Sequence, residues 1–263
     1  GVARNMGIAF DADYNLYICD NQGWSGKPEL AFKGRVLRVN ADDAGNILDW
    51  RVVAYGMEHP NGIKVRGNYM YLTQSYLTPV KDPSGKLVSC VYRFALDDEN
   101  IEITNTLADK HIIATFITEN PDCQYGVDGI EFDPQGNLYI GNFGDGAVYK
   151  LTFDENGDVA SKTLFAKDPE QLASTDGMVM DDEGNLYIAD FSANAIAKVS
   201  PDGKVERIAQ SPDTDGFHGE LDQPGEPCIW NGKIIVSCFD LVTDEGKVNT
   251  AHEMPATMSE LEL

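Results

Sequence analysis

Four residues with oxygen-bearing side chains stand at matching positions of a repeated sequence pattern. They are Asn61, Asp128, Asp176 and Glu226. Carboxylate and amide oxygens from several segments suit a hard divalent cation, and calcium accepts about six to eight such oxygens in irregular geometry. The sequence therefore predicts a divalent-cation site, with calcium preferred and magnesium, manganese or zinc as the other candidates.

A second interpretation of the same residues stays open. Asp-Gly and Asn-Gly are also turn dipeptides, and a carboxylate at the start of a strand can cap backbone amides. Met6 occupies the same position in the first copy of the pattern, so the pattern itself does not require a polar residue there. The polar residues of the later copies are therefore more informative than one of them alone.

The elements that must position these residues are short strands within a repeat. Each copy has an apolar run, a tight turn and a second apolar run such as Asn-Leu-Tyr-Ile, and clear copies cover 6–20, 128–142 and 176–190. Looser copies begin at Asn61 and Glu226, and the starts are 48–67 residues apart. Short strands that recur with a period of about 40–50 residues are typical of a propeller. The pattern predicts an all-β chain, a β-propeller of four-stranded blades.

Alternation of apolar and polar residues gives the strand boundaries within a blade. In the fourth copy we expect strands at 177–181, 186–190, 195–200 and 204–209. Corresponding third strands are expected at 35–40 and 147–153. No long amphipathic helix is expected.

The number of blades follows less directly from the sequence. Five blade starts are visible, but the segment 257–263 also alternates and looks like a strand without a blade of its own. We therefore expect 1–263 to be one propeller domain with six blades, part of one blade lying upstream of Gly1. The alternative is a five-bladed propeller in which 257–263 supplies an outer strand.

The long insertions all fall on the propeller face where the first strands begin. They are 21–34, 76–88, 116–126 and 211–225. Long loops on one face of a rigid scaffold are usually where ligands bind. We therefore expect substrate-binding residues in these loops and at the ends of the second strands, with His59 and Phe191 as further candidates. The predicted substrate-binding residues are Trp24, Tyr76, Tyr125, Asn142, Asp190 and His218.

Composition limits the class of partner. The formal net charge is −23, which argues against nucleic acid, and no run of about 18 apolar residues is present to span a membrane. The five cysteines form no Cys-x-x-Cys pair and mostly lie in apolar strand patterns, so we expect buried thiols. This favours a reducing, cytoplasmic compartment, with a periplasmic or secreted mature form as the alternatives. The expected partner is a small-molecule substrate, and the oligomeric state is open.

The spaced Asn-Gly-Ile, Asp-Gly-Ile and Asp-Gly-Met starts, each followed by a hairpin, resemble the SMP-30/gluconolactonase/LRE-like superfamily. So does the segment Met-Pro-Ala-Thr-Met-Ser-Glu-Leu-Glu-Leu at 254–263. The resemblance implies a six-bladed propeller with a divalent cation, often calcium, that hydrolyses sugar lactones or related esters. By this resemblance, Asp176 and Asn61 are expected to be metal ligands, and Asp128 stands where the family usually has Asn. The family also has a metal-binding Glu in its first blade, and this sequence has no clear match for it. Glu226 occupies a neighbouring position.

The leading hypothesis is therefore metal-dependent hydrolysis of a lactone or small ester. The cation would polarise the carbonyl group, and Asp176 would act as base or nucleophile. No Gly-x-Ser-x-Gly motif is present, which disfavours a serine hydrolase. The alternatives are a non-catalytic NHL-like propeller that binds a ligand or protein on this face, and a lyase or isomerase on the same scaffold.

Overall fold

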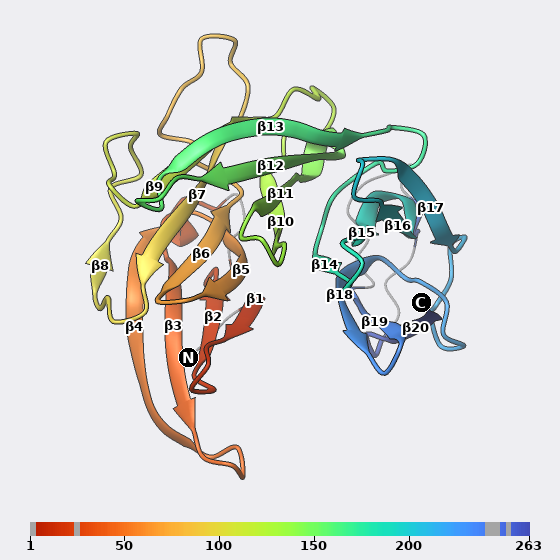
Figure 1. Ribbon diagram of the computed structural model, residues 1–263, viewed down its shortest axis with the longest axis horizontal. Coiled ribbons are helices and arrows are strands. Elements are labelled where there is room, and N and C mark those ends of the chain that lie inside the picture. Colours follow the sequence, from red (N-terminus) through yellow and green to blue (C-terminus); the bar gives the residue numbers. More distant parts are fainter. Residues whose placement is uncertain (1–3, 24–26, 240–247, 251–253) are drawn as a thin grey trace. The chain divides into compact units, whose positions relative to one another are not determined.

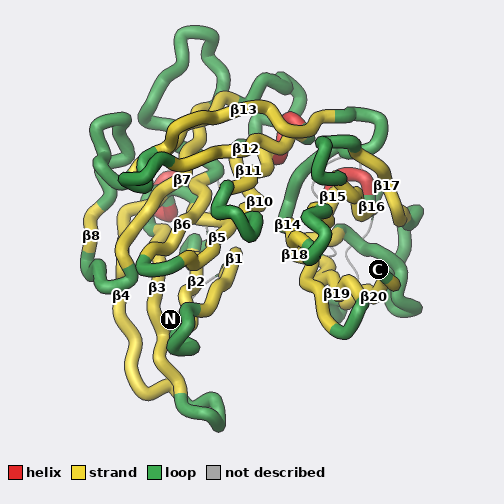
Figure 2. Tube along the Cα trace, in the orientation of Figure 1, coloured by secondary structure: helices red, strands yellow, loops and turns green. Residues whose placement is uncertain are grey.

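The computed structural model describes residues 4–23, 27–239, 248–250 and 254–263. The chain divides into two compact units, Gly1–Ile130 and Glu131–Leu263, and their sheets are antiparallel except for one short parallel strand pair. Figure 2 shows strands and loops throughout, with helix only as short single turns. Among the residues described, no helix is long and apolar enough to cross a membrane.

The first unit contains two sheets, each of which begins with strands that follow one another in the chain (Figure 1). The strands of the first sheet are β1 (Asn5–Phe10), β2 (Leu16–Asp20), β3 (Gly34–Ala41) and β4 (Ile47–Met57), with the short β8 (Ile101–Glu102) parallel to β4. The strands of the second sheet are β5 (Pro60–Arg66), β6 (Tyr69–Gln74), β7 (Val88–Ala95) and β9 (Ile112–Ile117). The 3-10 turn η1 (Pro28–Leu30) lies between β2 and β3.

The second unit follows the same plan with three sheets. The first of them contains β10 (Val127–Phe132), whose residues up to Ile130 belong to the first unit, together with β11 (Leu138–Asn142), β12 (Ala147–Phe153) and β13 (Val159–Lys167). The next contains β14 (Met178–Met180), β15 (Leu186–Asp190), β16 (Ala195–Val199) and β17 (Val205–Gln210). The last contains β18 (Pro224–Trp230), β19 (Lys233–Cys238) and β20 (Met258–Glu262). Two 3-10 turns, η2 (Phe143–Asp145) and η3 (Phe191–Ala193), follow β11 and β15.

The all-β prediction is confirmed, and the expected strands match the structure to within a residue or two. The preference for six blades is not supported, because the described residues form five sheets. The alternative prediction of a five-bladed propeller agrees with this number. The segment 257–263 does not belong to a sixth blade. It pairs as β20 with β19, so it supplies the third strand of the last sheet.

Apolar side chains from neighbouring sheets meet in shared buried clusters, as expected when side chains alternate between the two faces of each strand. Residues that share a cluster are Tyr17 with Leu72, Val148 with Ile188, and Ile196 with Val236. All five cysteines are free thiols, and Cys19, Cys90 and Cys238 are buried as predicted. Cys123 is half-buried and Cys228 is exposed, so the expectation of buried thiols fails for these two.

A carboxylate closes the turn between the first two strands in three of the sheets. In the fourth copy, Asp181 Oδ1 accepts hydrogen bonds from the amides of Glu183 and Asn185, at 3.0 and 2.8 Å. Its Oδ2 accepts from Asn185 Nδ2 and Tyr187 Oη, at 2.8 and 3.2 Å. Asp11 and Asp133 bond their own Asn and Tyr in the same way. The sequence Asp-x-x-Gly-Asn-Leu-Tyr is therefore a self-closing hairpin.

The hydrogen bonds also set the ionisation of these carboxylates. Partial burial alone would raise the pKa of Asp181, but the bonds from Asn185, Tyr187 and Glu183 outweigh it and lower the pKa below its ordinary value. Exposed turn carboxylates such as Asp42 and Asp154 are bonded to amides of their own turns, and their pKa values are lowered as well.

We predict that Asp181→Asn lowers the free energy of unfolding by about 1–2 kcal/mol at neutral pH, because an amide nitrogen would then face two donors. The pKa of Asp181 is lower in the folded chain than in the unfolded one. Its contribution is therefore complete above pH 3.8 and is lost as the pH falls through the folded value. Urea unfolding at pH 7 and near pH 3 should show the difference shrinking in acid. Asp182→Asn, an exposed neighbour in the same turn, is the control; an equal loss in both variants would contradict the assignment.

The fourth residue of this turn needs a positive φ, which Gly136 and Gly184 supply at 94° and 86°. Tyr14 holds the same position at φ 62° with its side chain exposed. We predict that Tyr14→Gly raises the free energy of unfolding by about 0.5–1 kcal/mol, since relief of the left-handed backbone exceeds the entropic cost of glycine. Gly184→Ala should lower it. Thermal melts compare the two, and a destabilised Tyr14→Gly would refute the equivalence of the turns.

Candidate functional site

The first strands of neighbouring sheets touch through their backbones at glycine. A Cβ at Gly7 would lie 2.7 Å from Asn61 O, and one at Gly62 would lie 2.5 Å from Asp128 O. In the second unit, a Cβ at Gly177 would lie 2.6 Å from Gly225 O. Only glycine allows such close approach. Packing between the sheets therefore requires glycine directly after Met6, Asn61 and Asp176. The Asn-Gly and Asp-Gly dipeptides lie within or beside strands, not in reverse turns.

Asn61 is fixed by two hydroxyl groups in the first unit. Its Nδ2 donates to Ser75 Oγ at 3.2 Å and to Tyr125 Oη at 3.1 Å. Ser75 Oγ in turn donates to Val127 O at 2.8 Å, next to the buried Asp128. Because both donor positions of the amide are used, its oxygen Oδ1 is oriented away from these hydroxyls, as an acceptor or a cation ligand requires.

An aromatic cluster contacts this amide through Tyr125. Tyr125 Oη lies 3.2 Å from His59 Nε2, and the rings of His59, Tyr76 and Tyr125 pack with centroids 5.2–5.7 Å apart. Burial lowers the pKa of His59 to about 4, so this imidazole is neutral at physiological pH. It can therefore accept a hydrogen bond from the Tyr125 hydroxyl group. Burial, together with the nearby Cys123, Glu58 and Asp128, raises the pKa of Tyr76.

The other two candidate ligands lie in the second unit. Asp176 is half-buried; its backbone amide donates to Ala189 O at 3.0 Å, and its Oδ1 accepts from the Gly177 amide at 3.0 Å. The exposed Glu226 lies with its carboxylate against the side of Gly177 that a Cβ would occupy. The structure thus brings Asn61 together with Asp128 in one unit, and Asp176 together with Glu226 in the other.

Among the predicted substrate-binding residues, Asp190 has internal bonds to both oxygens. Its carboxylate is fully buried and accepts from the amides of Ala173 and Ser174 at 2.8 and 2.9 Å, with Arg207 at 3.4 Å. Burial raises the pKa of Asp190 in spite of these bonds. This carboxylate holds the Ala173–Ser174 backbone rather than facing solvent.

The remaining predicted binding residues are placed as follows. Asn142 ends β11 and is fully buried, and Tyr76 and Tyr125 belong to the aromatic cluster around Asn61. His218 is exposed, and its amide donates to Glu220 Oε2 at 3.0 Å. Trp24 lies outside the described residues.

The donor chemistry at these positions fits a hard divalent cation. Asn61 offers an oriented amide oxygen, and Asp128, whose backbone lies against Gly62, offers a buried carboxylate. Within the described part of the chain, no group of three or more His, Cys, Asp or Glu side chains is gathered as a metal site. A cation there would therefore depend on amide oxygens as well as carboxylates.

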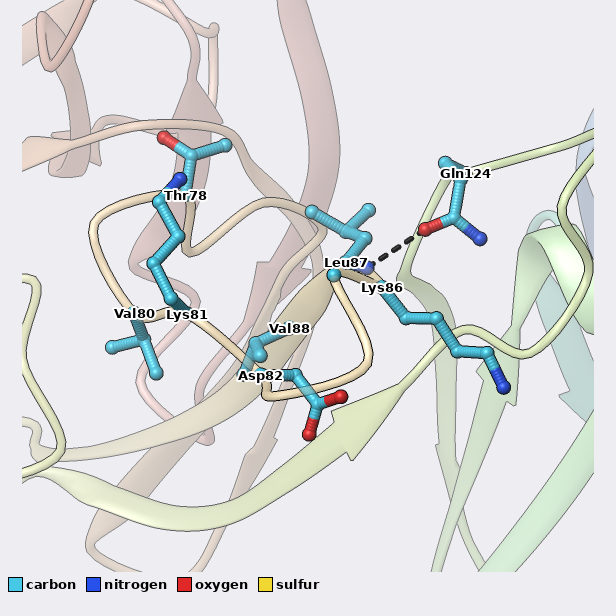
Figure 3. A pocket seen from close by; sticks show the side chains of 9 residues that line it. Thr78, Val80, Lys81, Asp82, Lys86, Leu87, Val88 and Gln124 are labelled. Carbon is cyan, nitrogen blue, oxygen red and sulfur yellow. Dashed lines mark hydrogen bonds between the residues drawn. The ribbon is translucent and has the colours of Figure 1, made fainter.

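A small cavity is lined mainly by residues of the long loop between β6 and β7. Its volume is about 260 Å³, and Figure 3 shows Lys86 and Gln124 on one side, with Gln124 Oε1 accepting from the Leu87 amide at 2.7 Å. Thr78 also lines it and bonds Glu58 through both its amide and its hydroxyl. Sequence reasoning missed Glu58, because one acidic residue before His-Pro carries no repeat signal.

The fold and these positions define a β-propeller with polar residues at its first-strand starts. Residues 145–217 match the family model described as SMP-30/Gluconolactonase/LRE-like region, which confirms the resemblance seen in the sequence. This segment includes Asp176 and the strands β14–β17 around it.

Several solved structures share the fold. A gluconolactonase of Xanthomonas campestris matches with a TM-score of 0.56 and 18% identity over 88% of this chain and 68% of its own. A luciferin-regenerating enzyme matches with a TM-score of 0.59 and 13% identity over 95% and 94%. Virginiamycin B lyase from Staphylococcus aureus matches with a TM-score of 0.51 and 12% identity over 98% and 70%. Comparison with curated protein sequences gives no match. At such identities the likeness shows the fold alone.

We predict that Gly62→Ala lowers the free energy of unfolding by about 1–3 kcal/mol, because the new methyl group would overlap Asp128 O and the Ile130 side chain. Urea unfolding measures the change. Gly45→Asn is the control, since that glycine lies in an open turn at φ 81° and Asn tolerates this conformation. A loss no larger in Gly62→Ala than in the control would show that the strands do not approach as closely as described.

Proposed function

We propose that this chain is a metal-dependent hydrolase that opens a lactone or cleaves a small ester. The observation that carries the proposal is the family match across 145–217, which contains the Asp176-Gly-Met start. Structural likeness to gluconolactonases supports it at the level of the fold. Because one fold hosts many reactions, the choice of reaction depends on the site residues.

The proposed ligands of the divalent cation are Asn61, Asp128, Asp176 and Glu226, and calcium is the preferred ion. The support is their equivalent position in the repeat and the hard oxygen chemistry that they share. When bound, such a cation supplies a Lewis acid that polarises a carbonyl oxygen.

Asp176 is the proposed base, with a nucleophilic role as the alternative. As base, its carboxylate takes a proton from water while the water oxygen bonds to the carbonyl carbon. The bond from that carbon to the leaving oxygen then breaks, and the proton passes to the leaving alkoxide. A lactone gives a hydroxy acid, and an ester gives an acid and an alcohol.

The aromatic cluster of the first unit has a positioning role in this proposal. Tyr125 and Ser75 hold the nitrogen of the Asn61 amide, so its oxygen keeps one orientation. Neutral His59 accepts from Tyr125 and keeps that hydroxyl in place. Tyr76 offers an aromatic wall, and Trp24 and His218 remain proposed substrate contacts from the sequence. Asn142 and the carboxylate of Asp190 are fully buried, so neither is proposed to touch the substrate.

We predict that Asp176→Asn lowers kcat/KM by about 100-fold or more on any lactone or ester that the protein hydrolyses, since the amide accepts no proton. Asp182→Asn, an exposed residue of the same sheet, is the matched control and should retain the rate. Chelation should abolish turnover and calcium should restore it. Calorimetric calcium binding to Asn61→Ala and Asp128→Ala should be weaker than to the unmodified chain, independently of turnover.

Other outcomes distinguish the alternatives. Full activity of Asp176→Asn, or turnover without any divalent cation, would contradict the proposal. A product without oxygen from isotopically labelled water would indicate a lyase or isomerase. Ligand binding without turnover across lactones and esters would indicate a binding propeller.

A further inference from the structure

Three phenylalanines occupy the same place in three consecutive sheets of the second unit. Phe143, Phe191 and Phe239 each come directly after a second strand, β11, β15 or β19. Phe143 and Phe191 begin the 3-10 turns η2 and η3. Their rings meet edge to face in a row, with centroids 5.8 Å apart for Phe143–Phe191 and 6.0 Å apart for Phe191–Phe239. We call these three residues the phenylalanine arc.

The arc lies around the segment that carries Asp176. The Asp176 amide bonds Ala189 O, two residues before Phe191. Gly141, two residues before Phe143, lies so close to Thr175 that a Cβ there would be 2.6 Å from Thr175 Oγ1.

Phe239 is linked to the Asp176 segment through Gly225. The Gly177 amide donates to Gly225 O at 2.8 Å, and a Cβ at Gly225 would lie 2.5 Å from Phe239 Cε2. The Phe239 amide also donates to Gln223 O at 2.9 Å, which holds this residue beside the start of β18. The strand ends that carry Phe143 and Phe191 therefore contact the Thr175–Gly177 segment, and Phe239 contacts Gly225, the bonded neighbour of Gly177.

The arc presents apolar surface where a polyhydroxylated ligand would need polar partners. Phe239 is 44% exposed, and Phe143 and Phe191 are half-buried. The polar residues that immediately precede two of them, Asn142 and Asp190, are fully buried. Aromatic rings in an edge-to-face row bind alkyl or aryl groups, because binding buries apolar surface. Phenylalanine side chains form no hydrogen bonds with the hydroxyl groups of a sugar.

We propose that the phenylalanine arc is an apolar subsite, and that the substrate is a lactone or ester carrying an alkyl or aryl group rather than a sugar lactone. The inference rests on the proposed hydrolase function for the reaction, but the binding of an apolar group stands on the arc itself. The carbonyl group would lie at Asp176 and the apolar substituent along Phe191 toward Phe143 or Phe239.

The test compares γ-butyrolactone, γ-hexalactone, γ-nonalactone and D-glucono-δ-lactone as substrates. The expected kcat/KM rises about fourfold for each methylene that the arc covers, the fold-change that corresponds to about 0.8 kcal/mol. The gluconolactone should be the poorest substrate. In Phe239→Ala, the ratio of kcat/KM for γ-nonalactone to that for γ-butyrolactone should fall about tenfold. Phe191→Leu, which keeps the packing volume, should lower the same ratio less.

Trp230→Ala is the matched control, because Trp230 is an exposed aromatic residue at the opposite end of β18 from Gly225. It should leave the ratio unchanged. A preference for gluconolactone, or a chain-length ratio that is the same in Phe239→Ala and in Trp230→Ala, would overturn the subsite.

Binding of a lactam analogue, γ-nonalactam, separates this inference from the proposed function. Calorimetry on the metal-free chain should detect the lactam and find it weaker in Phe239→Ala but not in Trp230→Ala. If the lactam binds in this way while no lactone is hydrolysed, the subsite stands and the hydrolase proposal fails. If lactones are hydrolysed while γ-nonalactam binds no better than γ-butyrolactam, the subsite fails and the hydrolase proposal stands.

Discussion

Close contact between the backbones of neighbouring first strands is the constraint on which the rest of this fold depends. At Gly7, Gly62 and Gly177 the next sheet's carbonyl oxygen occupies the space that a Cβ would need. Thr73 reinforces one such contact, since its hydroxyl accepts from the Gly62 amide and donates to Asp128 O. The residue before each glycine is thereby fixed at the edge of the strand contact, and for Gly62 and Gly177 this residue is the polar Asn61 or Asp176. The glycine contacts that pack the sheets therefore also hold the candidate site residues in place.

The sequence predicted the hairpins well because their signals are local. Asp181, Asn185 and Tyr187 close their turn within seven residues of chain, so the pattern and the structure coincide there. The number of sheets depended instead on pairings between distant segments. β20 pairs with β19 across an interval of about twenty residues, and alternation in 257–263 indicates a strand without naming its partner. The parallel pairing of β8 with β4 is equally non-local, and β8 is too short for a pattern.

For the candidate site, the residue types were easier to predict than the directions of their side chains. Asn61, Tyr76 and Tyr125 were chosen separately and lie in one cluster. Asp190 was predicted as a binding residue because it is a polar residue at a strand end. Its carboxylate instead faces inward and contacts Arg207 and the Ser174 backbone. Phe143 and Phe239 carry no polar atoms that would mark a ligand or catalytic group, although their shared position after the second strand is visible in the repeat.

The turn carboxylates bear on how a product would leave. Hydrogen bonds from Asn46 and neighbouring amides lower the pKa of Asp42, and similar bonds lower the pKa values of Asp154 and Asp202, so these side chains are negatively charged at neutral pH. The net charge of −23 thus includes carboxylates that also close the hairpins. A neutral lactone meets no electrostatic barrier from such a surface, whereas ring opening creates an anion that the same field repels. For the proposed reaction, the acidic exterior would speed departure of the hydroxy acid and weaken product inhibition.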